Sequence, residues 1–326
     1  TTNYWGGHFN IVAYGERLII EKEWGHLDDR DNFPNTYYNV IMINDEVNSD
    51  YNQVRGNVKA NLTTQDLDYV VFLTNHSNTA QGSSYVKNNV NLKRGAFFID
   101  KKFVIMIDRL TSNKTNKYSF NLHGASGNKT GKSDFVKNSQ SAEWTKPNGV
   151  KILAEFVNPV NIITKQAYDF IEFNNETFIQ AQTNNKDVDY MTILYPMDAE
   201  EEKPVITKYN TLEHTAAKIQ TRTGKTVIGI NKAEQTTYEK LTTDAEIALI
   251  KTDETGTIQY YAIINGTRLE YDSQILINQA QRGNYNSFET LTTKSLTYKI
   301  ITFIKSLLSK KTGNAIITGN FFKILK

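Results

Sequence analysis

The chain consists of many short segments of β-branched and aromatic residues, each closed by a turn rich in Asn, Asp or Gly. His8–Ala13, Val104–Leu110 and Tyr118–His123 are examples. Successive segments follow one another at intervals of about 8–15 residues, a spacing typical of antiparallel sheets. Val, Ile, Thr, Tyr and Phe favour strands over helices. The sequence therefore predicts an all-β fold: a multi-stranded antiparallel β-sandwich with a smaller β appendage.

One segment departs from this pattern. Leu296–Leu308 carries Leu and Ile at helical spacing and predicts a C-terminal amphipathic helix, which we expect to cover an edge or face of a sheet. Val86–Leu92 and Ala96–Ile99 are predicted as two separate strands. The acidic stretch before residue 205 suggests a boundary between a β-sandwich at 1–204 and a smaller β-rich region at 205–326. The alternative is one continuous domain.

Charge and composition exclude several classes of function. The 37 Lys and Arg residues nearly balance the 35 Asp and Glu residues, which leaves a net charge of +2 and no broad field to attract nucleic acid. The chain contains no Cys, so a disulfide and a thiolate metal site are both excluded. No apolar run is long enough for a membrane-spanning helix.

A series of motifs in the first 124 residues points to a family. The series is Gly7–Ile20, Tyr38–Asn44, Lys93–Ile99, Phe103–Leu110 and Tyr118–Gly124. In order and spacing, these motifs resemble the C-terminal β-sandwich of heparinase II/III-like polysaccharide lyases. The resemblance covers residues 7 to 124.

The resemblance implies a function. In this family an N-terminal α/α toroid precedes the β-sandwich, and the active cleft lies between them. The reaction is β-elimination on an acidic, uronic-acid-containing polysaccharide. We expect the catalytic Tyr and His of the toroid to lie outside this chain, in a helical domain of the same precursor. Secretion, or export to the periplasm, is also implied by the resemblance.

Some family members hold a structural zinc with His and Asp residues of the β domain. At the matching positions this chain has Thr1, Asn3, Trp5 and Tyr38. Zinc needs three or four converging N, O or S ligands, which this set does not supply. We therefore expect no family-type zinc and no other cofactor. A calcium site formed by Asp28, Asp29 and Asp31 is an alternative, since hard cations take several oxygen ligands.

The candidate site residues follow from the same alignment. His8 and Tyr38 are the candidates for proton transfer, and Asn39 for binding a carboxylate. The expected substrate-binding residues are Asn3, Tyr4, Trp5, Trp24, His26, Arg30 and Asn39. Trp and Tyr can stack on the apolar face of a sugar, and Arg can pair with a carboxylate. The alternatives are that His8 and Tyr38 are packing residues of a strand and that Trp5 fills the space of the lost metal ligands.

Two functional hypotheses remain open at this stage. The chain is either the β-sandwich part of a lyase for acidic polysaccharide or a non-catalytic, glycan-binding or structural β domain derived from such a lyase.

Overall fold

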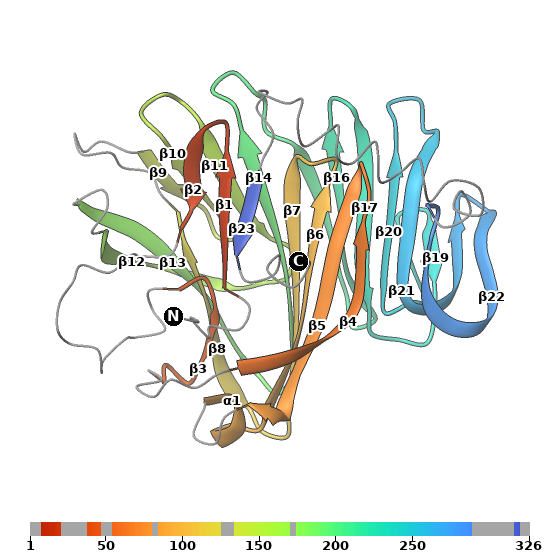
Figure 1. Cartoon of the computed structure of the whole chain (residues 1–326), viewed down its shortest axis with the longest axis horizontal. Helices are drawn as coiled ribbons and strands as arrows, with labels where there is room; N and C mark the ends of the chain where they lie inside the picture. Colours follow the sequence, from red (N-terminus) through yellow and green to blue (C-terminus); the bar gives the residue numbers. More distant parts are fainter. Residues whose placement is uncertain are drawn as a thin grey trace, which may run out of the picture. The chain divides into compact units, whose positions relative to one another are not determined.

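The computed structural model describes residues 8–20, 38–46, 54–79, 84–124, 134–169, 174–288 and 316–319. These residues form strands almost throughout, and the strands pair antiparallel, which confirms the predicted all-β class (Figure 1). The helix in the described ranges is one short turn, α1 (Ser84–Lys87). The predicted helix Leu296–Leu308 lies outside the described residues.

The chain divides into two compact units. Unit 1 comprises Thr1–Glu201 and Gly313–Lys326, and unit 2 comprises Glu202–Thr312.

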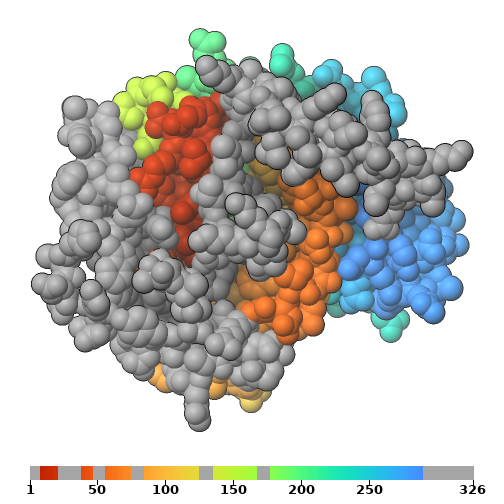
Figure 2. Space-filling view, in the orientation of Figure 1, coloured from red at the N-terminus to blue at the C-terminus, as the bar shows by residue number. Residues whose placement is uncertain are grey.

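Unit 1 contains three sheets. The largest has eight strands in the order β4 (Val54–Thr63), β5 (Leu67–Thr79), β6 (Val90–Ile99), β7 (Phe103–Ser112), β14 (Val188–Met197), β11 (Lys151–Phe156), β10 (Ser141–Thr145) and β9 (Asp134–Lys137). A four-stranded sheet has the order β12 (Asn161–Asp169), β13 (Asn174–Asn185), β8 (Asn116–His123) and β3 (Ile41–Ile43). The third has the order β2 (Glu16–Ile19), β1 (Phe9–Ala13) and β23 (Ile316–Gly319). The edge strand β4 lies at the surface in the space-filling view (Figure 2).

The core of unit 1 follows from strand alternation. In β8, Tyr118, Phe120 and Leu122 point into one cluster with residues from all three sheets. Successive side chains of a strand point to opposite faces, so one face of each strand supplies this core. Trp144 is fully buried there and donates a hydrogen bond to the carbonyl of Thr177 at 2.8 Å. A side chain at Gly124 would place its Cβ 2.0 Å from the Trp144 ring, so this position requires glycine.

An ion pair lies inside this apolar core. Arg94 of β6 and Asp108 of β7 face each other in register, and their side chains are 1% and 0% exposed. The guanidinium donates from Nε to Oδ1 and from Nη2 to Oδ2, the second at 3.0 Å, and it stands 5.4 Å from the Phe120 ring centre. Burial raises the pKa of Asp108, and the Arg94 charge only partly offsets this effect.

Unit 2 is an eight-stranded sheet with its own core. Its main order is β15 (Val205–Asn210), β16 (His214–Thr221), β17 (Gly224–Asn231), β20 (Ile247–Thr252), β21 (Ile258–Tyr271), β19 (Leu241–Thr243) and β18 (Thr236–Tyr238), and β22 (Gln274–Asn286) pairs with β21. The hairpin β18–β19 covers one face. Its Tyr238 lies over Gly229, where an added Cβ would stand 2.3 Å from the Tyr238 ring.

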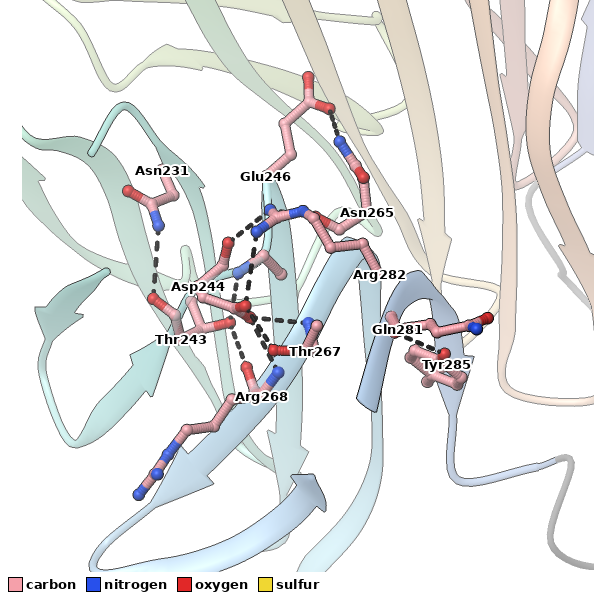
Figure 3. A network of polar contacts seen from close by, with 11 residues as sticks. Asn231, Thr243, Asp244, Glu246, Asn265, Thr267, Arg268, Gln281, Arg282 and Tyr285 are labelled. Atoms are coloured by element: carbon pink, nitrogen blue, oxygen red, sulfur yellow. Dashed lines mark hydrogen bonds and ion pairs between the residues drawn. The ribbon is translucent and has the colours of Figure 1, made fainter. Parts of the chain in front are cut away.

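A polar network fixes the irregular pairing of β21 with β22. Asp244 Oδ1 accepts the backbone N–H groups of Thr267 and Arg268, each at 2.8 Å. Arg282 of β22 donates to the carbonyls of Asp244 and Asn265 at 2.8 and 2.6 Å (Figure 3). The partners of these contacts on β21, Asn265, Thr267 and Arg268, lie at its register shifts, where side-chain bonds supplement the irregular ladder.

The prediction of a strand at Val86–Leu92 was wrong for its first residues, since β6 begins at Val90. Residues 84–87 form α1, whose Tyr85 hydroxyl donates to the Ile41 carbonyl at 3.2 Å, and this tertiary contact overrides the local strand preference. The predicted strand Ala96–Ile99 is the end of one continuous strand, β6.

The buried ion pair yields a stability prediction. Asp108→Ala leaves the Arg94 charge buried without its partner, and we expect the free energy of unfolding to fall by about 3–5 kcal/mol. The double variant Arg94→Met/Asp108→Leu should lose much less, because neither charge remains. Urea unfolding followed by circular dichroism measures both. As a control, Asp45→Asn in the exposed pair with Lys117 should cost less than about 1 kcal/mol. Equal losses in the single and double variants would contradict this account.

A second prediction concerns pH. His214 Nδ1 lies 2.9 Å from the Thr236 hydroxyl, and burial together with the Lys232 charge lowers the His214 pKa from its usual 6.5, against the opposing charge of Glu213. The unfolded chain therefore takes up this proton first, so the stabilisation is complete above pH 6.5 and is lost as the pH falls below it. The protection factors of the amides of β16 and β18, which compare their exchange with that of the unfolded chain at the same pH, should fall as the pH is lowered from about 7.5 to about 5.5 in the wild type, and less so in His214→Gln. An identical pH response in both proteins would exclude His214 as the cause.

Candidate functional site at the junction of β1, β3 and β8

Three of the predicted site residues meet in unit 1. His8 directly precedes β1, while Tyr38 and Asn39 precede β3. The rings of His8 and Tyr38 meet edge to face with their centres 5.4 Å apart. The other predicted site residues and the calcium candidates lie outside the described residues: Asn3, Tyr4, Trp5, Trp24, His26, Asp28, Asp29, Arg30 and Asp31.

Asn39 is the centre of this junction. Its Nδ2 donates to the carbonyls of Phe9 and Ile20 at 2.8 and 3.0 Å, and its Oδ1 accepts the backbone N–H of His123 at 2.8 Å. One amide thereby joins the β1–β2 hairpin to the end of β8. The side chain is fully buried, so each of these bonds is formed away from water.

The hydrogen bonds of the two imidazoles assign opposite tautomers when both rings are neutral. His8 Nδ1 accepts the backbone N–H of Asn39 at 3.2 Å, which leaves the ring proton on Nε2. His123 Nδ1 lies 3.2 Å from Asn39 Oδ1, an acceptor, so Nδ1 carries the proton and Nε2 keeps a lone pair. The His123 ring stacks on Phe178 with centres 4.5 Å apart. The junction thus places one possible proton donor and one possible acceptor beside the same amide.

The junction continues into a buried polar layer that sequence reasoning missed. Ser119, Asn121 and His123 alternate with the core residues of β8 and therefore share its opposite face. Gln180 of the neighbouring β13 donates to Asn121 Oδ1 at 2.9 Å. The signal was available in the sequence, because polar residues at every second position of an otherwise apolar strand indicate a second, polar environment.

The junction also closes two stretches of the chain. Residues 21–37 connect Ile20 to Tyr38, and Asn39 holds their two ends together through its bond to the Ile20 carbonyl. Residues 1–7 lead into His8, which is bonded to the same residue. All the substrate-binding candidates other than Asn39 belong to these two stretches. The described residues that border these stretches, His8 and Ile20, are thus both bonded to Asn39.

The side chains at the junction do not fit a family-type zinc site. The described residues supply two imidazoles, a phenol and an amide, and no group of three His, Asp or Glu side chains in the described ranges is arranged to hold a metal. Structural zinc needs a closed set of four N, O or S ligands, so we derive no step through a metal.

The fold of the described residues is similar to that of part of two solved structures. Heparan sulfate lyase HepC from Pedobacter heparinus is similar, with 13% identity and a TM-score of 0.51 over 65% of this chain and 34% of that chain. A structure described as the Heparinase III-BT4657 gene product gives 11% identity and a TM-score of 0.51 over 69% of this chain and 36% of that one. The predicted resemblance is thereby confirmed at the level of the fold. The chain spans about a third of the length of these lyases.

Comparisons of sequence gave no match: no family model and no curated protein matches the chain. In the described part of the chain, no helix has the length and hydropathy of a membrane span.

The hydrogen bonds of the Asn39 side chain predict that this amide contributes strongly to the stability of the protein. Asn39→Ala removes four hydrogen bonds, to the carbonyls of Phe9 and Ile20 and from the backbone N–H and Nδ1 of His123, which we expect to destabilise the protein by at least about 2 kcal/mol. Asn39→Asp should be nearly as harmful, since a carboxylate cannot donate to the carbonyls of Phe9 and Ile20. Asn121→Ala, a buried amide of the same polar layer that accepts a bond from the Gln180 side chain, serves as the comparison and should destabilise the protein less. Thermal unfolding measures all three, and an unchanged melting temperature in Asn39→Ala would refute the bracing role.

Proposed function

We propose that this chain is the β-sandwich part of a polysaccharide lyase that cleaves a uronic-acid-containing polysaccharide by β-elimination. The similarity of its fold to heparan sulfate lyase structures supports this proposal. A helical toroid of the same protein would complete the active cleft and supply further catalytic groups. Such an enzyme acts on an extracellular polymer, so we also propose secretion or export to the periplasm.

The observation that carries the proposal is that Asn39 bonds to His8 and Ile20, the described residues next to the stretches 1–7 and 21–37, which contain the proposed substrate contacts. β-Elimination needs a base for the C5 proton, an acid for the departing 4-oxygen and a partner that neutralises the uronate carboxylate. Residues 1–7 and 21–37 offer Trp, Tyr, His and Arg for sugar and carboxylate contacts, and Asn39 holds the points where they enter and leave the domain. His8 Nε2–H and the Tyr38 hydroxyl are the proposed proton-transfer groups of this chain.

One observation favours the second function, a non-catalytic glycan-binding domain. His8, Tyr38 and Asn39 are 5%, 4% and 0% exposed, and the amide of Asn39 is engaged by backbone groups of its own chain. In that case the junction braces the two substrate-binding stretches, and chemistry belongs to the toroid alone.

An activity assay distinguishes the two functions. The full-length protein should convert heparan sulfate, hyaluronan or alginate to products with an unsaturated uronate, which absorbs in the ultraviolet. If His8 transfers a proton, His8→Gln should lower kcat by about 100-fold or more with little change in KM. Tyr38→Phe tests the phenol in the same way.

The controls separate chemistry from folding. Each variant must keep the wild-type melting temperature, and His76→Gln serves as a matched histidine control outside the junction. Full activity in both His8→Gln and Tyr38→Phe would assign the chain the non-catalytic role. Absence of the unsaturated product with every acidic polysaccharide would refute the lyase proposal.

A further inference from the structure

The hairpin β18–β19 of unit 2 carries a carboxylate that is held by three donors. Glu239, in its turn, accepts a hydrogen bond from the Tyr209 hydroxyl at 2.8 Å. Lys218 Nζ lies 3.3 Å and Lys225 Nζ 3.8 Å from Glu239 Oε1. The three donors come from β15, β16 and β17, so neighbouring strands converge on one carboxylate.

Strand register places these donors on one face of the sheet, at the margin of the part that hairpin β18–β19 covers. Lys225 pairs with Gln220, which lies on the same side of β16 as Lys218. Val205, which pairs with Gln220, is 66% exposed, and Gln220 is also exposed. The Lys218 and Lys225 side chains keep 26% and 20% of their surface. The cluster therefore lies at a surface that a ligand can reach.

The charges at this cluster do not balance. Two ammonium groups face one carboxylate, which leaves one positive charge in excess, and Lys225 Nζ is also 5.6 Å from the Tyr271 ring centre. Burial alone would raise the pKa of Glu239, yet the hydrogen bonds from Tyr209 and Lys218 and the charges of Lys218 and Lys225 lower it. A phenol and two ammoniums are the donors with which proteins bind the carboxylate of a ligand.

The hairpin does not depend on Glu239 for its attachment. Tyr238 is buried against Gly229, and Thr236 Oγ1 lies 2.9 Å from His214 Nδ1. On the other side of the turn, Leu241 is 0% exposed in the core of unit 2. These contacts hold the hairpin at both ends, so the Glu239 carboxylate can leave its donors while the hairpin stays in place.

We propose that Tyr209, Lys218 and Lys225 form a binding site for a uronate carboxylate of an acidic polysaccharide, and that Glu239 occupies this site as an internal competitor. This inference rests on the proposed function, because that function supplies a uronate polymer as the ligand. It adds a second place, in unit 2, at which the polymer is held away from the junction at Asn39.

Binding of the whole chain to immobilised alginate and hyaluronan, two uronate polymers without sulfate, tests the site. Glu239→Gln removes the competitor's charge and should tighten binding about threefold or more, whereas Lys218→Gln/Lys225→Gln should weaken it by a similar factor. Tyr209→Phe, which keeps the ring and loses the donor, should also weaken it. All effects should shrink as salt is added, because the contacts are electrostatic.

The exposed pair of Lys240 and Asp272 supplies matched controls. Asp272→Asn removes one negative charge, as Glu239→Gln does. Lys240→Gln removes one positive charge, as each of the two lysine substitutions does. Neither control should alter binding. Neutral dextran should not bind. Tighter binding in Asp272→Asn equal to that in Glu239→Gln would show a general charge effect and overturn the proposal. A lower melting temperature in Glu239→Gln with no gain of affinity would make Glu239 a structural latch and also overturn it.

Two further outcomes separate this site from the lyase proposal. Binding of heparan sulfate without binding of the unsulfated polymers would reject a carboxylate site. In the full-length protein, the double lysine variant should still form unsaturated product from short oligosaccharides while losing affinity for long chains. Absence of that product, with the binding pattern intact, would refute the lyase proposal and leave the carboxylate site standing.

Discussion

The junction of unit 1 depends on the amide of Asn39. Its two donors and its acceptor each meet a backbone group of a different segment: at the start of β1, after β2 and at the end of β8. A backbone polar group buried without a partner costs a substantial fraction of a domain's net stability. The amide satisfies three such groups at once, and it does so at the place where two candidate-bearing stretches enter the sheet. Bracing the scaffold and presenting the ligand contacts are therefore tied to one residue.

Local patterns in the sequence predict much of this fold. Alternation of apolar side chains identifies β8, and short continuous apolar runs identify β7 and β11, whose side chains are buried on both faces. The same reasoning does not predict the strands β12 and β15. Both lie at sheet edges, are rich in polar residues and are largely exposed. Edge strands lack the buried face that produces the pattern, so sequence periodicity identifies them poorly.

The site was predictable only in part. Similarity to a family placed His8, Tyr38 and Asn39 near one another, and the structure brings them into contact. The role of Asn39 as a brace was not predictable, because its partner His123 is 84 residues away and no local rule encodes that pairing. The carboxylate cluster of unit 2 was missed for the same reason. Tyr209, Lys218, Lys225 and Glu239 belong to four separate segments, and only the register of the sheet collects them.

The pairing of β21 with β22 has a consequence for solubility. A long edge strand normally presents a straight row of N–H and C=O groups to which another chain can add, and this is a common route to aggregation. Among the described strands β22 pairs only with β21, and three register shifts interrupt that pairing. Arg282 and Asp244 hold the strand at one of these interruptions with side-chain bonds that no incoming strand can copy. Such an edge stays attached to its own sheet while it offers no regular template to a neighbouring molecule.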